Sequence, residues 1–238
     1  IMPSLVGSEM CIRDRRRIDL NEAANFLREN DRFLILMHGS PDGDTVGCGT
    51  ALCGALQQIG KLAKLACPDP IPKKFGYMFR EIKEQDFEPE TIIAVDVADT
   101  KLLYGMKEIG EKTQLCIDHH VSNTEYAERL LLAPEYAAAA ELMFELLSSM
   151  KEVKITNSIA DSLYTGIATD SGCFKYSNTS PQTHVYAAEL MTLGADIVPI
   201  NYAMFDMKSQ GRLKLEQLAL SKIRYYSSGR IAVIDVTQ

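Results

Sequence analysis

Three short apolar runs in this chain each carry an aspartate or a histidine at or near their carboxyl end, and this pattern restricts the fold most strongly. The runs are FLILMH, TIIAVDVA and QLCIDHH, at residues 33–38, 91–98 and 114–120. Continuous apolar runs of this length are typical of strands that are buried on both faces of a parallel sheet. The carboxyl ends of such strands meet at one edge, where open α/β sheets bind their ligands. The sequence therefore predicts a parallel sheet with polar side chains gathered at that edge.

Further apolar runs and helical patterns complete the expected architecture. We expect five strands, over residues 33–38, 61–68, 91–98, 114–120 and 129–134. We expect helices over residues 20–30, 44–60, 137–150, 156–170 and 181–193. Asp19 and Glu22 form a capping-box pattern, and Ser180 before Pro181 is a helix start. This alternation predicts an α/β, doubly wound, mainly parallel five-stranded sheet with helices on both faces, followed by a helical segment.

The two ends of the chain differ from this core. Residues 1–17 contain MPSLVGSEMCIRDR, which has no clear period and resembles translated sequencing-adapter sequence, so we expect a non-native or disordered tail. A frayed, arginine-rich tail is the alternative. We expect a catalytic domain over residues 18–205 and a linker helix over 206–228. The strand-like run at 229–238 then predicts the start of an incomplete C-terminal domain, or an added edge strand of the main sheet.

Composition excludes several classes of protein. No apolar run reaches the roughly 20 residues that a membrane-spanning helix needs. The net charge of −7 argues against binding to long duplex nucleic acid, which requires a broad basic surface. None of the six cysteines forms a C-x-x-C pair, so we expect no structural zinc site. Free thiols and the lack of a convincing export signal predict a cytoplasmic protein.

Acidic and imidazole side chains at the expected strand and helix ends indicate a metal site. Four negative charges, which two divalent cations would neutralise, come from Asp42, Asp44, Asp96 and Asp170. A ligand set that mixes carboxylate oxygens with imidazole nitrogens suits Mn²⁺, whereas an all-oxygen set is typical of Mg²⁺. The sequence therefore favours two divalent cations, with Mn²⁺ first and Mg²⁺ or Co²⁺ as alternatives.

Each of these residues also has a structural interpretation when it is taken alone. His38 could be a buried histidine at a strand end, and Asp44 could cap the following helix. Asp96 could be an ordinary loop aspartate. Asp170 closes a helix, where an anion opposes the helix dipole unless something compensates it. Taken together they favour metal binding, because a fold alone does not require acids and imidazoles at so many strand ends.

Four motifs carry a resemblance to a known family: HGSPDGDTVG, AVDVAD, CIDHHVSN and ATDSGCFKYSNTSP. Over about residues 18–238 the chain resembles the DHH-family phosphoesterases. Within that family it is most similar to the bacterial oligoribonucleases (nanoRNases) that also dephosphorylate 3′-phosphoadenosine 5′-phosphate (pAp).

The resemblance implies a role for each candidate residue. It implies that His38 and Asp42 bind one metal ion. Asp44, His119 and Asp170 would bind the other, and Asp96 would bridge the two. Asp118 would support the ligands, and His120 would contact the phosphate or protonate the leaving oxygen. Lys175, in the loop after Asp170, is a candidate phosphate partner. Asp118, His120 and Lys175 are thus the candidate catalytic residues, and His120 and Lys175 the candidate substrate-binding residues.

The implied function is a metal-dependent phosphohydrolase. It would degrade short RNA oligonucleotides from 3′ to 5′ into mononucleotides and convert pAp to AMP. The alternatives are a phosphodiesterase for cyclic or linear dinucleotides, an inorganic pyrophosphatase, and a catalytically impaired nucleotide-binding fragment. Members of the family carry a C-terminal Gly-Gly-His element that does not occur before Gln238, so we expect incomplete substrate binding. The expected partners are short single-stranded RNA, pAp or other small nucleotides, and a homodimer is compatible with this interpretation.

Overall fold

The computed structural model describes residues 16–235. These residues fall into two units, and the boundary between the units in the sequence lies between Ile200 and Asn201. Apart from Arg16 and Arg17, the tail expected over residues 1–17 lies outside the described residues. Across residues 16–235, no helix has both the length and the apolar composition needed to cross a membrane.

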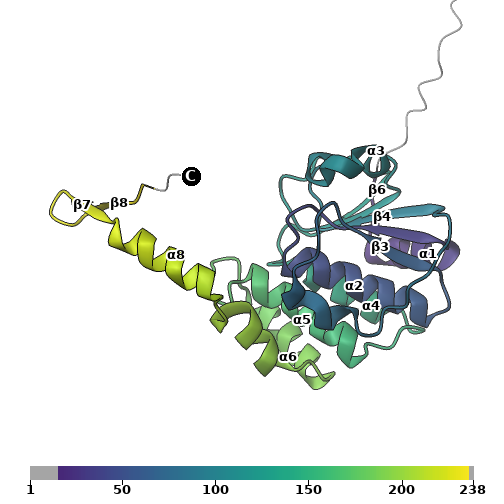
Figure 1. Ribbon diagram of the computed structural model, residues 1–238. Helices are drawn as coiled ribbons and strands as arrows, with labels where there is room; N and C mark the ends of the chain where they lie inside the picture. The colour runs from purple at the N-terminus through teal and green to yellow at the C-terminus, as the bar shows by residue number, and fades with distance from the viewer. Residues whose placement is uncertain (1–15, 236–238) are drawn as a thin grey trace, which may run out of the picture. The chain divides into compact units, whose positions relative to one another are not determined.

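A six-stranded parallel sheet forms the centre of the first unit (Figure 1). In spatial order its strands are β1 (Arg16–Arg17), β6 (Arg129–Leu132), β5 (Leu115–Asp118), β4 (Thr91–Val95), β2 (Phe33–Leu36) and β3 (Ala63–Ala66). Every neighbouring pair is parallel. The five expected strands are confirmed, but the expected number was wrong by one.

The additional strand is β1, at the edge of the sheet, where the sequence predicted only a tail. It pairs with β6 through the N–H of Arg16, which donates to the carbonyl of Glu128, and the N–H of Ile18, which donates to that of Leu130. Both arginine side chains are exposed. Two residues without an apolar side chain carry no strand periodicity, so local pattern could not reveal this strand.

Helices cover both faces of the sheet, as expected (Figure 1). One face is covered by α1 (Leu20–Glu29), α2 (Gly43–Gln58) and α4 (Ala139–Ser149), with α5 (Asn157–Asp170) packed on α2 and α4 and α6 (Pro181–Thr192) packed on α5. The other face carries the 3₁₀ helix η2 (Thr100–Met106) and α3 (Lys107–Gly110). There Leu103 packs with Leu34, Leu36 and Leu130 of the sheet. The remaining elements of this unit are η1 (Lys73–Phe79) and α7 (Ile197–Asn201).

Local capping follows the sequence at most helix starts. The capping box of Asp19 and Glu22 is present at α1, and Ser180 caps α6. At α2 the cap is Asp42, whose carboxylate accepts from the N–H groups of Asp44 and Thr45. The alternative in which Asp44 caps this helix was therefore wrong, and its carboxylate has other contacts.

Helices α2 and α5 pack closely in opposite directions. A Cβ atom at Gly47 would lie only 2.3 Å from the carbonyl oxygen of Ser162, so only glycine fits at this crossing. Further along the pair, a Cβ atom at Gly43 would meet the hydroxyl of Thr169. The N-terminus of α2 therefore lies beside the C-terminus of α5, which ends at Asp170.

The second unit contains a π-helical turn, η3 (Tyr202–Asp206), then α8 (Gln210–Ser221) and a hairpin of β7 (Arg224–Tyr226) and β8 (Ile231–Val233). The helix expected over residues 206–228 is thus shorter. It ends at Ser221, and the hairpin turn that follows holds Ser227, Ser228 and Gly229 at φ values of 52°, 58° and 83°, which are not helical. The domain assignments to residues 18–205, 206–228 and 229–238 stay predictions.

Candidate metal centre

The candidate site lies where the order of the strands across the parallel sheet changes direction. The chain passes from β2 to its neighbour β3 on one side, while β4, on the other side of β2, leads on to β5. Ligands of open α/β sheets bind outside the carboxyl ends of strands at such a point. His38 follows β2, Asp96 follows β4, and Asp118 closes β5 directly before His119 and His120.

One group of polar side chains joins the loop after β2 to the end of β4. The His38 Nε2 atom lies 3.6 Å from Asp42 Oδ1 and 3.6 Å from Asp96 Oδ2. One ligand atom from each of these three residues lies within 4.8 Å of the others, as a shared cation requires. Asp42 is in this position because it caps α2, the helix that begins just after the loop.

A second group lies on the other side of Asp96. The His119 Nε2 atom is 3.4 Å from Asp170 Oδ2, 3.9 Å from Asp44 Oδ2 and 3.7 Å from Asp96 Oδ1. The close crossing of α2 and α5 brings Asp44 and Asp170 together. The structure thus brings together all six residues that the sequence singled out as ligands.

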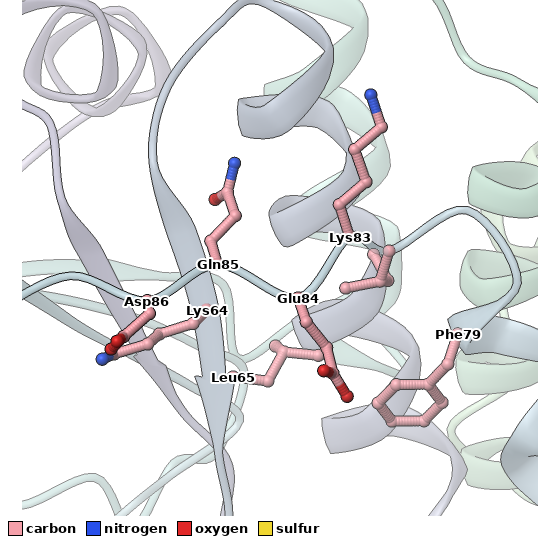
Figure 2. Close-up of a pocket in the computed structure, with 8 residues that line it drawn as sticks. Lys64, Leu65, Phe79, Lys83, Glu84, Gln85 and Asp86 are labelled. Carbon is pink, nitrogen blue, oxygen red and sulfur yellow. The ribbon is translucent and has the colours of Figure 1, made fainter.

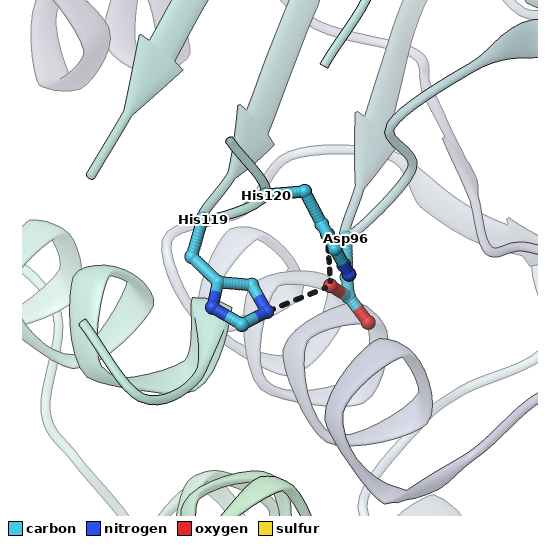
Figure 3. Close-up of side chains that lie close together, drawn as sticks. All are labelled: Asp96, His119 and His120. Carbon is cyan, nitrogen blue, oxygen red and sulfur yellow. Dashed lines mark ion pairs between the residues drawn. The ribbon is translucent and has the colours of Figure 1, made fainter. Parts of the chain in front are cut away.

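Asp96 lies between the two groups and is 2% exposed. Its Oδ2 atom faces His38 and its Oδ1 atom faces His119, while His119 and His120 both point toward it (Figure 3). Its backbone adopts a φ of 56°, in the left-handed region that is uncommon for non-glycine residues but more accessible to aspartate than to most.

Within residues 16–235, two buried polar atoms at the centre of the cluster find no hydrogen-bond partner. They are Asp96 Oδ1 and His119 Nε2. Leaving such atoms unpaired costs free energy, so folded proteins ordinarily give them a partner. A carboxylate oxygen and an imidazole nitrogen are both ligands for divalent transition metals, so the residues present fit a metal ion.

Asp44 has a structural role that the sequence did not reveal. It is fully buried, and its two oxygens accept from the N–H groups of Ala139 at 2.6 Å and Ala140 at 2.9 Å. These groups lie at the start of α4, whose own N-cap residue is Ala138 and offers no side-chain acceptor. Asp44 therefore caps α4 from a different helix, across 95 residues of sequence.

Asp118 fixes the position of the His120 ring. Its Oδ1 atom accepts from the N–H of His119 at 2.8 Å and pairs with His120 Nδ1 at 2.7 Å. Its Oδ2 atom accepts from the side-chain amide of Asn123 at 2.6 Å. The ring of His120 is 41% exposed, so its Nε2 atom is the nitrogen left for a substrate. The sequence missed Asn123, although it lies in the CIDHHVSN motif.

A third set of ligand atoms also lies within 4.8 Å, from Asp96, His119 and His120. His120 Nδ1 lies 3.5 Å from Asp96 Oδ1, and it already pairs with Asp118 at the shorter distance of 2.7 Å. We therefore prefer a supporting role for this nitrogen. Lys175 is exposed in the turn after α5, where its N–H donates to the carbonyl of Ser171, and its role as a phosphate partner stays a prediction.

The crowded charges shift the pKa values of the cluster. Burial lowers the pKa of His38, but its interactions with Asp42 and Asp96 outweigh burial and raise it to about 11. Burial also lowers the pKa of His119, and the interaction with Asp170 raises it to about 10. Burial raises the pKa of Asp96 to about 6, with repulsion from Asp42 among the further causes. Protons on the two imidazoles therefore offset part of the charge of the four carboxylates when no cation is bound, and metal binding must displace these protons.

A hollow elsewhere in the first unit has a different character. A pocket of about 670 Å³ lies between the edge strand β3 and the segment that follows η1 (Figure 2). Its lining residues are Lys64, Leu65, Phe79, Ile82, Lys83, Glu84, Gln85 and Asp86. None of them belongs to the metal cluster, and their mixed charges favour no particular ligand.

Comparisons with known proteins agree with this geometry. A family model described as "DHH family, N-terminal domain" matches residues 32–167. A Thermus thermophilus protein named bifunctional oligoribonuclease and PAP phosphatase NrnA is 28% identical over 209 residues, which are 86% of this chain and 63% of that protein. A Mycoplasma genitalium protein of the same name is 30% identical over 186 residues, 75% of this chain and 58% of that protein. The chain thus spans about 60% of the length of these relatives.

A solved structure shows the same fold. It is an exopolyphosphatase-related protein from Bacteroides fragilis, which superposes with a TM-score of 0.79 at 24% identity. The match covers 90% of this chain and 68% of that one. The α/β architecture and the family resemblance that the motifs predicted are both confirmed.

Proposed function

Because the chain belongs to the DHH family, we propose that it is a two-metal phosphohydrolase that degrades short RNA oligonucleotides from 3′ to 5′ and converts pAp to AMP. The names of its relatives from Thermus thermophilus and Mycoplasma genitalium support both activities. The observation that carries the proposal is the position of Asp96, whose two oxygens face two separate groups of ligands.

The proposed ligands follow these two groups. His38 and Asp42 would hold one cation, and Asp44, His119 and Asp170 the other, with Asp96 shared between them. Four carboxylates match the charge of two divalent cations. The mixture of imidazole and carboxylate favours Mn²⁺, with Mg²⁺ and Co²⁺ as alternatives.

The chain's own residues orient the substrate. Divalent cations at such a site lower the pKa of a water molecule and offset the charge of a phosphate group. Asp118 keeps the ring of His120 fixed, so that Nε2 can contact a phosphate oxygen or give a proton to the leaving oxygen. Lys175 would add a positive charge for the phosphate.

The proposal also includes a cytoplasmic location, since the cysteines of the described chain are all free thiols. Oligomeric state is a separate question, and light scattering coupled to size exclusion would show whether the chain forms a homodimer.

The test is hydrolysis by the 238-residue chain with Mn²⁺ and without it. The substrates are pAp, an end-labelled RNA trinucleotide, a cyclic and a linear diadenylate, and inorganic pyrophosphate, with Asp96→Asn as the matched variant. We expect Mn²⁺-dependent release of phosphate from pAp and of 5′-mononucleotides from the trinucleotide, both lost in the variant. Turnover of only the diadenylates or only pyrophosphate would replace the proposed substrates. Bis-p-nitrophenyl phosphate, a small ester that needs the cations and little else, is assayed beside them, and no turnover of any of these compounds would contradict the proposal.

A further inference from the structure

Tyr104 presents an exposed ring beside the metal cluster while its hydroxyl is occupied. The side chain is 52% exposed, and the hydroxyl donates to Asp69 Oδ2 at 2.5 Å. The same carboxylate oxygen accepts from the backbone N–H of Ser40 at 2.7 Å. The hydroxyl of Tyr104 is therefore held in place by Asp69, and this hydrogen bond fixes the orientation of the ring.

The three residues lie in segments that follow three neighbouring strands. Ser40 follows β2, Asp69 follows β3, and Tyr104 lies in η2 after β4. Their hydrogen bonds therefore tie together the loops at the carboxyl ends of β3, β2 and β4. This is the edge of the sheet at which the metal cluster lies and at which such folds bind ligands.

Gly39 shows how close the ring is to the cluster. It directly follows the candidate ligand His38, and its N–H donates to the carbonyl of Leu102 at 2.8 Å. A Cβ atom at Gly39 would lie 2.1 Å from the Tyr104 hydroxyl oxygen, so a larger residue would displace the tyrosine. The chain thus places Tyr104 against the loop that supplies His38 and Asp42.

This is also the side of the cluster that is open to solvent. The side chain of Asp42 is 52% exposed, whereas that of Asp44 in the other group is fully buried. A substrate that reaches the cations from solvent would pass Asp42, which lies three residues after Gly39, the residue that Tyr104 packs against. An aromatic ring that is already fixed loses little conformational entropy on binding, and nucleobases stack on such rings.

We propose that Tyr104 is the surface on which a nucleobase of the substrate stacks, so that the site selects nucleotides over phosphates that lack a base. This inference rests on the proposed function, which it deepens by naming a residue that recognises the substrate. It also gives Asp69 a part, because Asp69 anchors the ring.

A second exposed tyrosine serves as the competing assignment. Tyr176 is 61% exposed, and its ring lies over Gly172, two residues after Asp170. It follows a ligand of the buried group, and the proposal gives it no role in stacking.

The experiment measures binding, so that it does not depend on turnover. Isothermal titration calorimetry with Mn²⁺ present would give Kd for AMP and for ribose 5-phosphate, which carries a hydroxyl at C1 in place of the base. The proteins are the wild-type chain, Tyr104→Ala, Tyr104→Phe, Tyr176→Ala and the control Met191→Ala, which alters an exposed residue of α6.

We expect the wild-type chain to bind AMP about 5- to 150-fold more tightly than ribose 5-phosphate, the range that base stacking on an aromatic ring gives. Tyr104→Ala should remove most of this preference, Tyr104→Phe should keep most of it, and Met191→Ala should match wild type. The proposal is overturned if wild type shows no preference or no AMP binding, if Tyr104→Ala retains the preference, or if only Tyr176→Ala loses it. Failure of pAp hydrolysis with an intact, Tyr104-dependent preference would contradict the proposed function and leave the stacking surface standing.

Discussion

The two halves of the metal cluster differ in exposure and in what else their residues do. The open half, His38 and Asp42, has side-chain exposures of 14% and 52%. The closed half consists of Asp44, His119 and Asp170, with exposures of 0%, 12% and 25%. Asp96 is shared by both halves.

The closed half is built into the core of the fold. Asp44 caps α4, and His119 Nδ1 pairs with the carbonyl of Tyr136 at 3.1 Å. In the open half Asp42 caps only the helix that it precedes. Substitutions in the closed half should therefore lower both stability and activity, whereas substitutions in the open half should lower metal binding and activity with little loss of stability.

The largest effect should come from Asp96→Ala, which removes the carboxylate that joins the halves. We expect Mn²⁺-dependent hydrolysis of pAp to fall by at least about 1,000-fold, because neither cation would keep its full set of ligands. Steady-state kinetics at saturating Mn²⁺ would measure this. Asp99→Asn, three residues further on, is the matched control and should stay near wild type. Activity within tenfold of wild type in Asp96→Ala would show that the halves do not share this residue.

The next prediction distinguishes the two halves by how much a substitution in each lowers the free energy of unfolding. Asp44→Ala leaves the N–H groups of Ala139 and Ala140 without an acceptor, and we expect the free energy of unfolding to fall by about 2–4 kcal/mol, even after relief of carboxylate repulsion. Asp42→Asn should change it by less than about 1 kcal/mol, because asparagine is an equally good N-cap. Urea denaturation in metal-free buffer would measure both variants. Equal losses of unfolding free energy in Asp44→Ala and Asp42→Asn would contradict the proposed difference between the halves.

A third prediction concerns pH and tests both halves together. With pKa values of about 11 for His38 and about 10 for His119, both rings are protonated at neutral pH when no cation is bound. The stability that these ion pairs give is complete below the unfolded pKa near 6.5 and is lost as the pH rises through 10 to 11. A metal ligand must be neutral, so the affinity for Mn²⁺ should rise with pH by about tenfold per unit for each proton displaced.

Calorimetry between pH 6.5 and 8, in buffers that differ in ionisation enthalpy, would count the protons released on metal binding. We expect at least two protons, one from each imidazole, because burial and repulsion from Asp96 also raise the pKa of Asp44, which can release a further proton. An affinity that does not change with pH would mean that the imidazoles are not ligands.

The smallest effect should lie outside both halves. Asn123→Ala removes the amide that holds Asp118 Oδ2, so the ring of His120 is less firmly oriented. We expect kcat on pAp to fall by about tenfold with Mn²⁺ binding unchanged, as for other groups that orient catalytic residues. Thr124→Ala, in the same turn, is the control. Wild-type kcat in Asn123→Ala would show that Asp118 needs no such support.

The sequence revealed those features that depend on neighbouring residues. Apolar runs predicted five strands of the sheet, and caps such as Asp19 and Ser180 predicted helix starts. The strand ends pointed to His38, Asp96 and His119, because parallel strands share one edge.

What the sequence concealed depends on contacts between distant segments. The strand β1 exists through its pairing with β6, and Asp44 caps a helix that begins 95 residues later. Tyr104 meets Gly39 and Asp69 only once three strands are side by side. Local periodicity carries no information about such contacts.

The central claim is that the two halves each hold a divalent cation and share Asp96. Equilibrium dialysis of the 238-residue chain against Mn²⁺, with metal analysis, tests it most directly. We predict two Mn²⁺ ions per wild-type chain, and one in Asp42→Asn, where the closed half remains intact. A single ion in the wild-type chain, or two ions undiminished in affinity in Asp42→Asn, would contradict this account.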